Sequence, residues 1–211
     1  MEFKDLSKRF SLEALQRNDL SNDPFVQFQR WMEVAVNANI PELNAMSLAT
    51  ASFSGKPSCR IVLLKQFNRS GLVFFTNYES RKAKELFENP YAAATIFWES
   101  LMRQISVEGK VEKTSQEESE AYFSQRPRGS QLGAWASQQD QTIASREVLE
   151  EKLRIVTEKY QEKAVPIPPY WGGFRLIPSR FEFWQGAKDR MHDRFHYVPE
   201  GDGWKVERLS P

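Results

Sequence analysis

Residues 45–77 read AMSLATASFSGKPSCRIVLLKQFNRSGLVFFTN, and their pattern indicates a β-rich fold. Three apolar runs are separated by two turn signals, Ser-Gly-Lys-Pro at 54–57 and Asn-Arg-Ser-Gly at 68–71. Clusters of Gly, Pro, Ser and Asn between short apolar runs are typical of turns between β-strands. Many short strands with few helices between them favour an antiparallel barrel over a parallel, doubly wound sheet.

On the N-terminal side of this stretch, the sequence predicts a helix and a preceding arm. Asp23 suits a helix N-cap and Pro24 the first helical position, so we expect a helix from there to about Asn39. Residues 1–20 are polar and weakly patterned, and we expect them to form a mobile arm. Residues 21–211 then form a single domain.

On the C-terminal side, the strand pattern continues, gives way to helices and then resumes. We expect a helical insertion at about 115–162, followed by separate strands at 173–177 and 180–185. The chain contains no Gly-x-Gly-x-x-Gly segment, which argues against a dinucleotide-binding fold. The class is therefore mainly β with helices (α+β).

The composition excludes several classes of protein. The 211 residues include 29 basic and 28 acidic ones, a net charge of +1 that provides no global field for nucleic acid or a membrane surface. Cys59 is the single cysteine, which excludes an internal disulfide and suits a reducing compartment. The charged start lacks the apolar stretch of a secretory signal, so we expect a cytoplasmic protein.

Ser80-Arg81-Lys82 is the first candidate site. Ser80 is a suitable N-cap, yet two cations follow in the first helical turn, where the helix dipole disfavours them. A bound anion would reverse that effect, because backbone N–H groups and both cations would converge on it. The alternative is a solvated basic turn, which costs little.

Tyr122, Arg126 and Ser130 form the second candidate site. Tyr122 and Arg126 are four residues apart and share a helix face. Pro127 disfavours helical backbone at Arg126, and Ser130 is then expected to cap the next helix. An arginine, a phenol and a hydroxyl suit a phosphate group. A solvated surface turn is the alternative.

The segment from Arg190 to Arg194 is the third candidate site. If Arg194 opens a strand, alternation places Arg190, His192 and Arg194 on one side. His192 and His196 are the only histidines, and no third His or Cys accompanies them. We therefore expect no metal site.

Arg60 and Lys65 flank a fourth segment, an apolar strand with a cation at each end. The two have opposite parity, so a straight strand would point them to opposite faces, and the pattern alone does not bring both to one site. Three separated cationic clusters in a nearly neutral chain nevertheless predict two phosphorylated ligands, or one ligand and one cofactor.

These motifs, in this order, resemble the pyridoxine/pyridoxamine 5'-phosphate oxidase family. The resemblance covers about residue 20 to the C-terminus. It is carried by the segments Arg60–Lys65, Phe74–Asn77, Ser80–Lys82, Arg126–Trp135, Phe183–Gly186, Arg190–Arg194 and Glu207–Pro211.

The resemblance implies a homodimer of antiparallel split β-barrels with FMN at the subunit interface. It implies oxidation of pyridoxine or pyridoxamine 5'-phosphate to pyridoxal 5'-phosphate by hydride transfer to the flavin, with O2 reduced to H2O2. The implied FMN contacts are Arg60, Ile61, Val62, Leu63, Leu64, Phe75, Thr76, Arg81, Lys82, Gln104, Gln139, Asp140, Trp184 and Arg194. The implied substrate contacts are Lys65, Tyr122, Arg126, Ser130, Arg190, Met191 and His192, with Arg190 and His192 as the catalytic residues.

Two positions depart from the family pattern. An Arg-x-x-Tyr pair of the N-terminal arm is replaced by Ser7-Lys8-Arg9-Phe10, which removes a guanidinium and a phenol from the lid over the substrate. Asp140 stands where a serine is common. We expect its side chain to turn away from a flavin phosphate, because like charges repel.

Two other functions stay open from the sequence. One is a related split-barrel flavin oxidase acting on another small aromatic, such as a phenazine precursor. The other is a non-catalytic carrier of flavin or pyridoxal phosphate, which only the altered N-terminal arm favours. The phosphate-binding set at 122–130 together with Arg190 and His192 favours a phosphorylated pyridine as the substrate of an oxidase.

Overall fold

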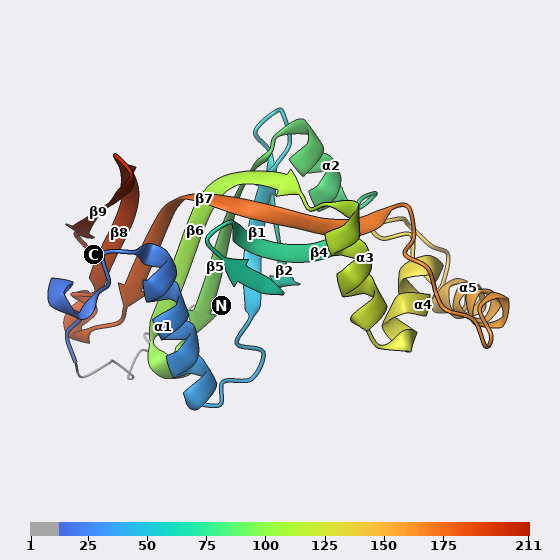
Figure 1. Ribbon diagram of the computed structural model, residues 1–211, viewed down its shortest axis with the longest axis horizontal. Coiled ribbons are helices and arrows are strands. Elements are labelled where there is room, and N and C mark those ends of the chain that lie inside the picture. Colours follow the sequence, from blue (N-terminus) through green and yellow to red (C-terminus); the bar gives the residue numbers. More distant parts are fainter. Residues whose placement is uncertain (1–12) are drawn as a thin grey trace, which may run out of the picture.

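The computed structural model describes residues 13–211 and shows a curled antiparallel sheet flanked by helices (Figure 1). The α-helices are α1 (Pro24–Asn37), α2 (Arg81–Glu88), α3 (Gln116–Gln125), α4 (Arg128–Ala136) and α5 (Arg146–Lys159). The strands are β1 (Ala45–Ala51), β2 (Pro57–Leu63), β3 (Gln66–Asn68), β4 (Gly71–Asn77), β5 (Tyr91–Trp98), β6 (Arg103–Lys113), β7 (Trp171–Gln185), β8 (Asp193–Glu200) and β9 (Gly203–Leu209). Short 3-10 turns lie at Arg17–Asp19, Glu99–Leu101 and Lys188–Arg190.

Strand β7 determines the shape of the sheet. The strand order is β2-β1-β5-β6-β7-β4-β3, with β8 and β9 attached to β7 as a branch. One edge of β7 pairs with β6, while the other pairs with β4 along 171–176 and with β8 along 181–185. The register against β6 shifts at Glu108 and Gly109, beside Pro178. This arrangement confirms the predicted antiparallel split barrel, but the two strands expected in this region are one.

Helix α1 begins at the predicted residue and covers part of the barrel. The Asp23 carboxylate caps it by accepting a hydrogen bond of 2.9 Å from Phe25 N–H. Phe28 and Trp31 are buried on its inner face, and Trp31 meets Phe183 edge-on at 5.2 Å between ring centroids. Each such buried aromatic side chain contributes about 1.5–3 kcal/mol.

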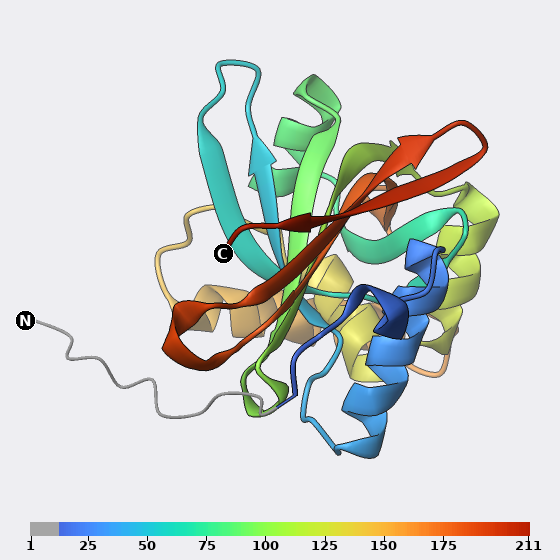
Figure 2. The ribbon, with the colours of Figure 1, turned by 90° about the vertical axis from the view of Figure 1, so that its left-hand side faces the viewer.

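The segment 13–20 lies against the branch formed by β8 and β9 (Figure 2). Leu15 and Leu20 are buried. Leu15 N–H donates to Asp193 Oδ2 at 2.9 Å, and Leu15 O accepts from Arg208 at 2.9 Å. This part of the expected arm is thus packed on the domain. The rest of the arm, with the positions that depart from the family pattern, lies outside the described residues.

The helical insertion lies at the other end of the molecule. Figure 1 shows α4 and α5 at the end opposite to β8 and β9. Helix α5 has no buried residues. Across residues 13–211, no helix has both the length and the apolar character needed to cross a membrane.

Candidate functional site

A cavity of about 1260 Å³ lies between β2, β4, the start of α2 and helices α3 and α4. That volume exceeds the range of about 300–1,000 Å³ usual for one small ligand. Fourteen predicted site residues, here called the cavity cluster, line it. They are Arg60, Ile61, Val62, Leu63, Lys65, Phe75, Thr76, Arg81, Lys82, Tyr122, Arg126, Ser130, Gln139 and Asp140.

Arg60 and Lys65 both line this cavity despite their opposite parity in the sequence. Strand β2 ends at Leu63, and the Leu64 side chain is buried in the hydrophobic core. Lys65 N–H then donates to Val73 O at 2.8 Å. Because the chain leaves β2 before Lys65, strand alternation no longer relates the two cations.

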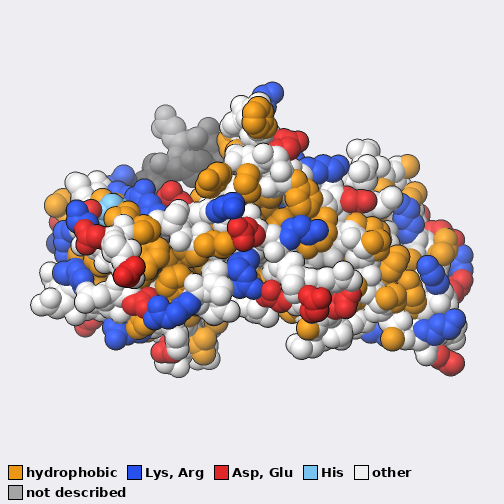
Figure 3. Space-filling view, turned by 45° about the horizontal axis from the view of Figure 1, so that its top comes forward, with side chains coloured by type: hydrophobic (Ala, Val, Ile, Leu, Met, Phe, Trp, Pro, Cys, Tyr) orange, Lys and Arg blue, Asp and Glu red, His pale blue; other side chains and the backbone are white. Residues whose placement is uncertain are grey.

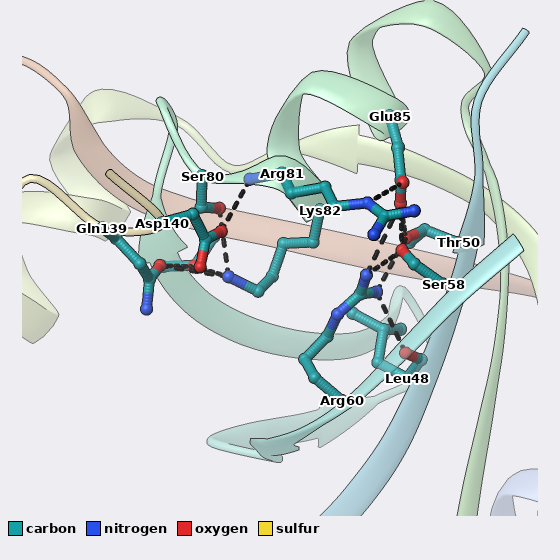
Figure 4. Close-up of polar contacts among 11 residues, drawn as sticks. Leu48, Thr50, Ser58, Arg60, Ser80, Arg81, Lys82, Glu85, Gln139 and Asp140 are labelled. Atoms are coloured by element: carbon teal, nitrogen blue, oxygen red, sulfur yellow. Dashed lines mark hydrogen bonds and ion pairs between the residues drawn. The ribbon is translucent and has the colours of Figure 1, made fainter. Parts of the chain in front are cut away.

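The Glu85 carboxylate lies between two cationic side chains (Figure 4). Its Oε1 accepts a hydrogen bond of 2.8 Å from Arg81 Nε. Its Oε2 accepts from Thr50 Oγ1 and Ser58 Oγ, each at 2.5 Å, and lies 3.5 Å from Arg60 Nη2. One buried carboxylate therefore positions two arginines that come from different elements.

Glu85 is ionised at neutral pH. Burial alone would raise the pKa of this carboxyl, whose side chain is 7% exposed. The hydrogen bonds from Ser58, Thr50 and Arg81 outweigh burial and lower the pKa of Glu85 to about 2. The carboxylate is thus a fixed counter-charge beside the cavity.

Lys82 is buried beneath the start of α2. Its Nζ donates to Ser80 Oγ at 3.0 Å, to Gln139 Oε1 at 3.0 Å and to Thr76 Oγ1 at 3.2 Å. Burial lowers the pKa of Lys82, and the negative charge of Asp140 opposes that shift. The ammonium group ties the loop after α4 to β4 and α2.

Asp140 faces the start of α2. Its Oδ2 accepts a hydrogen bond of 2.8 Å from Arg81 N–H. Its backbone φ is +68°, in the left-handed region. Without a bound anion, the Asp140 carboxylate occupies the backbone donor at the helix start.

An aromatic stack forms another wall of the cavity. The rings of Phe75 and Tyr122 stack with centroids 4.0 Å apart, and the Trp171 ring lies parallel to Phe75 at 5.5 Å. The Arg126 guanidinium lies over the Trp171 ring at 4.7 Å. Tyr122 and Arg126, predicted to act together, therefore meet on the same stack.

The Arg126 guanidinium has one unsatisfied donor. Its Nη1 is buried and has no hydrogen-bond partner within residues 13–211. Burial lowers the pKa of Arg126, and Tyr122 opposes that shift. Leaving a buried charged donor unsatisfied costs about 1–3 kcal/mol or more.

Ser130 lines the cavity, but its predicted role as a helix cap is wrong. Helix α4 begins at Arg128 with Pro127 as its N-cap, and Ser130 N–H donates to Pro127 O at 2.8 Å. The N-cap therefore lies three residues earlier than expected, at Pro127, whose φ is fixed by its ring. The predicted break at Arg126 is confirmed, since its backbone is extended.

Gln104, Trp184 and Arg194 lie side by side across β6, β7 and β8. Trp184 is the register partner of Gln104 on one side and of Arg194 on the other. Arg194 Nε donates to Glu182 Oε1 at 2.8 Å, and its Nη1 donates to Ser210 O at 3.0 Å. Its guanidinium is thus oriented by Glu182 of the neighbouring strand β7 and by Ser210 near the chain end.

The loop before β8 carries the two predicted catalytic residues. Asp189 and Arg190 both have left-handed backbone, with φ of +56° and +60°. Ala187 N–H donates to His192 Nδ1 at 3.1 Å, so Nε2 carries the proton of the neutral ring. Met191 is 68% exposed and lines a second cavity, of about 380 Å³, with His192.

Apart from Leu64, the predicted residues thus form two separate clusters. The second, here called the β8 cluster, consists of Gln104, Trp184, Arg190, Met191, His192 and Arg194. None of these residues lines the large cavity. In Figure 1, β8 lies at one end of the molecule, and β2, β4 and α2, which carry residues of the cavity cluster, lie between it and α4.

Exposed apolar side chains accompany both clusters. Ile61 is 65% exposed beside the large cavity, and Phe97 is 51% exposed and meets Trp184 edge-on at 6.4 Å. Acidic and basic side chains are interspersed over the face seen in Figure 3, without a large area of one sign. Such apolar groups are typical of surfaces that bind another chain or a ligand.

Sequence reasoning missed Glu85 and its two hydroxyl partners. The spacing of four between Arg81 and Glu85 was a readable signal, because such pairs meet on a helix. Thr50 and Ser58 lie 35 and 27 positions from Glu85, where no local pattern connects them. Within residues 13–211, no group of three or more His, Cys, Asp or Glu side chains is placed to hold a metal ion.

Family models match most of the chain. Residues 32–160 match a model described as pyridoxamine 5'-phosphate oxidase. Residues 171–211 match one described as pyridoxine 5'-phosphate oxidase C-terminal dimerisation region.

Full-length relatives and solved structures agree with these matches. The chain is 51% identical to the pyridoxine/pyridoxamine 5'-phosphate oxidase of Trichormus variabilis and 52% identical to that of Paraburkholderia phymatum, in each case over 98% of this chain and at least 97% of the relative. PhzG from Burkholderia lata, solved with tetrahydrophenazine-1-carboxylic acid, is 30% identical and superposes with a TM-score of 0.89 over 95% of this chain and all of its own. An FMN-binding protein from Nostoc punctiforme, 17% identical with a TM-score of 0.71 over 91% of this chain and all of its own, shares the fold.

The Glu85 network makes a prediction about stability. Because folding depresses the pKa of Glu85 from 4.5 to about 2, its contribution of about 3 kcal/mol is present above pH 4.5 and is lost as the pH falls toward 2. Glu85→Gln should therefore be about 3 kcal/mol less stable than the wild type at pH 7, and the gap should shrink to less than half at pH 3. Denaturant unfolding at both pH values measures this. Glu88→Gln, an exposed change on the same helix, is the control, and its free energy of unfolding should stay within about 0.5 kcal/mol of the wild type. A Glu85→Gln protein as stable as the wild type at pH 7 would contradict the assigned network.

Proposed function

The chain belongs to the pyridoxamine 5'-phosphate oxidase family, and from this premise we propose that it converts pyridoxamine 5'-phosphate and pyridoxine 5'-phosphate to pyridoxal 5'-phosphate. Bound FMN would supply the hydride acceptor, with dioxygen as the final oxidant and hydrogen peroxide as a product. With the amine substrate, water would supply the aldehyde oxygen and ammonia would leave as a further product. The observation that carries the proposal is that one cavity holds two separate sets of anion-binding donors.

The first set suits the phosphate of FMN. It combines a backbone N–H at the start of α2 with the cations Arg60, Arg81 and Lys82 and the hydroxyl of Thr76. Backbone donors at a helix start and converging cations are the usual means of binding a phosphate group. Glu85 would keep two of these cations in place.

The second set suits the phosphate of the substrate. Arg126 offers a buried donor beside Tyr122, and Ser130 and Lys65 line the same cavity. Arg126 packs against the aromatic stack, which limits the motion of its side chain, so it would hold the substrate in one orientation. An arginine is suited to this task because its planar group can donate to two phosphate oxygens.

The β8 cluster would act at the reacting end of the substrate. Arg190 is permanently charged and would stabilise negative charge that develops on the pyridine, while His192 would present its Nε2. None of these residues lines the large cavity of its own chain, so we propose that a second copy supplies them. The C-terminal match to a dimerisation region supports a homodimer in which each site draws on both chains.

The two other functions have less support. A flavin oxidase of another aromatic is suggested by the similarity to PhzG, but the relatives that are about 50% identical carry the pyridoxine/pyridoxamine name. The unpaired Nη1 of Arg126 also calls for an anionic substrate group. A non-catalytic carrier was suggested only by the N-terminal arm, which lies outside the described residues.

Cofactor identification and an aerobic assay test the proposal. Heat-released cofactor should be FMN by mass, and either phosphorylated substrate should yield pyridoxal 5'-phosphate with an equal amount of hydrogen peroxide. A protein that binds flavin and product without turnover would be a carrier. The proposal would be contradicted if the released cofactor were FAD, or if the protein retained no flavin after saturation with FMN.

Arg126→Ala should weaken substrate binding and leave the flavin in place. Loss of a charged hydrogen bond of about 1.5–3 kcal/mol should raise KM about 10- to 150-fold. Arg128→Ala is the matched control, because that guanidinium binds the carbonyls of Tyr160 and Lys163. Steady-state kinetics and the flavin absorbance per chain measure the two effects. Loss of flavin with unchanged KM would mean that the two phosphate sites are exchanged.

Mixing two defective variants tests whether a site draws on two chains. Arg126→Ala and Arg190→Leu homodimers should both be poorly active at low substrate concentration. In a random mixture half of the dimers carry both variants, and one of their two sites is intact, so about a quarter of wild-type activity should return. Co-refolding the two proteins measures this. If both arginines of a site come from one chain, no activity returns.

A further inference from the structure

The Asp140 side chain supplies the cap at the start of α2. Ser80 occupies the N-cap position but makes no side-chain capping bond, and its hydroxyl accepts from Lys82 instead. The Arg81 N–H donates to the Asp140 carboxylate, 59 positions along the chain. A carboxylate is a strong acceptor for such an N–H and is favoured by the helix dipole.

This carboxylate stands where the proposed phosphate would bind. Figure 4 shows Asp140 beside Ser80 and the backbone of Arg81, on the opposite side of α2's first turn from Glu85. The charge of Asp140 also reaches Lys82, whose pKa it raises against the effect of burial. An arriving phosphate and this carboxylate would share the same donors, and like charges in contact repel.

We propose that Asp140 is an internal competitor for the phosphate group of the cofactor, and that its carboxylate is displaced from Arg81 N–H when that group binds. The inference rests on the proposed function, because it takes FMN as the ligand. Asp140 then lowers the affinity for FMN, and it holds its loop against α2 until the phosphate replaces it.

The loop does not depend on this contact alone. Gln139 accepts hydrogen bonds from Lys82 and Thr76. The bond between Arg81 N–H and the Asp140 carboxylate can therefore break while the loop stays attached. The side chain of Asp140 is exposed, which leaves it room to move. Displacement therefore requires a side-chain rotation rather than a movement of the whole loop.

Asp140→Asn isolates the charge. Asparagine caps helices about as well as aspartate and tolerates a positive φ, so the amide oxygen can keep the bond to Arg81 N–H without a negative charge. FMN titrated into the flavin-depleted, full-length protein should bind about fivefold more tightly to this variant, as flavin fluorescence would report. Riboflavin, which lacks the phosphate, should bind equally to both proteins.

Asp202→Asn is the matched control, because it makes the same change in net charge at the exposed turn between β8 and β9. It should leave FMN affinity unchanged. Asp140→Gly, which also suits the positive φ, serves as a second neutral variant if the asparagine protein does not fold.

Several outcomes would overturn the inference. One is FMN binding to the neutral variants with unchanged or weaker affinity; another is an equal gain for riboflavin, which would show that the phosphate is not involved. An equal gain in FMN affinity in Asp202→Asn would show that the effect comes from net charge alone. Failure of the wild type and the variants alike to bind FMN would instead remove the proposed function.

Discussion

The fold depends on the continuous pairing of β6 with β7. Because β7 keeps one partner along one edge and divides the other edge between β4 and β8, it sets the positions of both. Strand β4 brings Phe75 and Thr76 to the large cavity, while β8 carries Arg194 to the far end. The separation of the two clusters follows from this branching of one strand.

The same strand shows where local sequence reasoning fails. Pro178 lacks an N–H and suggests a break, so two strands were expected where one forms. Pro178 pairs at the point where the register against β6 shifts, beside Gly109. Backbones approach so closely there that a Cβ on Gly109 would lie 1.9 Å from Ile177 O. The bulge accommodates the proline, and this requires a glycine 69 positions away.

Signals contained within a few residues predicted the fold well. Asp23 with Pro24 located the start of α1, and the turn clusters separated β1, β2 and β4. Pro127 predicted the break after α3, but local rules misplaced the start of α4. Of the site, cation spacing indicated two anion positions, and the family resemblance supplied the residues around them.

The remaining parts of the site depend on contacts between distant positions. The Asp140 carboxylate meets Arg81 across 59 residues and Thr50 meets Glu85 across 35, and helix or strand periodicity reports on neither. Periodicity also could not show that the β8 cluster lies outside the cavity. Such contacts depend on how distant segments pack together, so no local pattern in the sequence reveals them.

In the proposed homodimer, a ligand that contacts both the cavity cluster and the β8 cluster contacts two chains at once. A lone chain then offers no complete site, so the ligand draws subunits together by mass action. At a free concentration of 100 times its Kd, such a ligand adds about 2.7 kcal/mol to the stability of the assembly. The number of working sites would thus follow the supply of flavin as well as the amount of protein synthesised, and dilution would release the cofactor together with the partner.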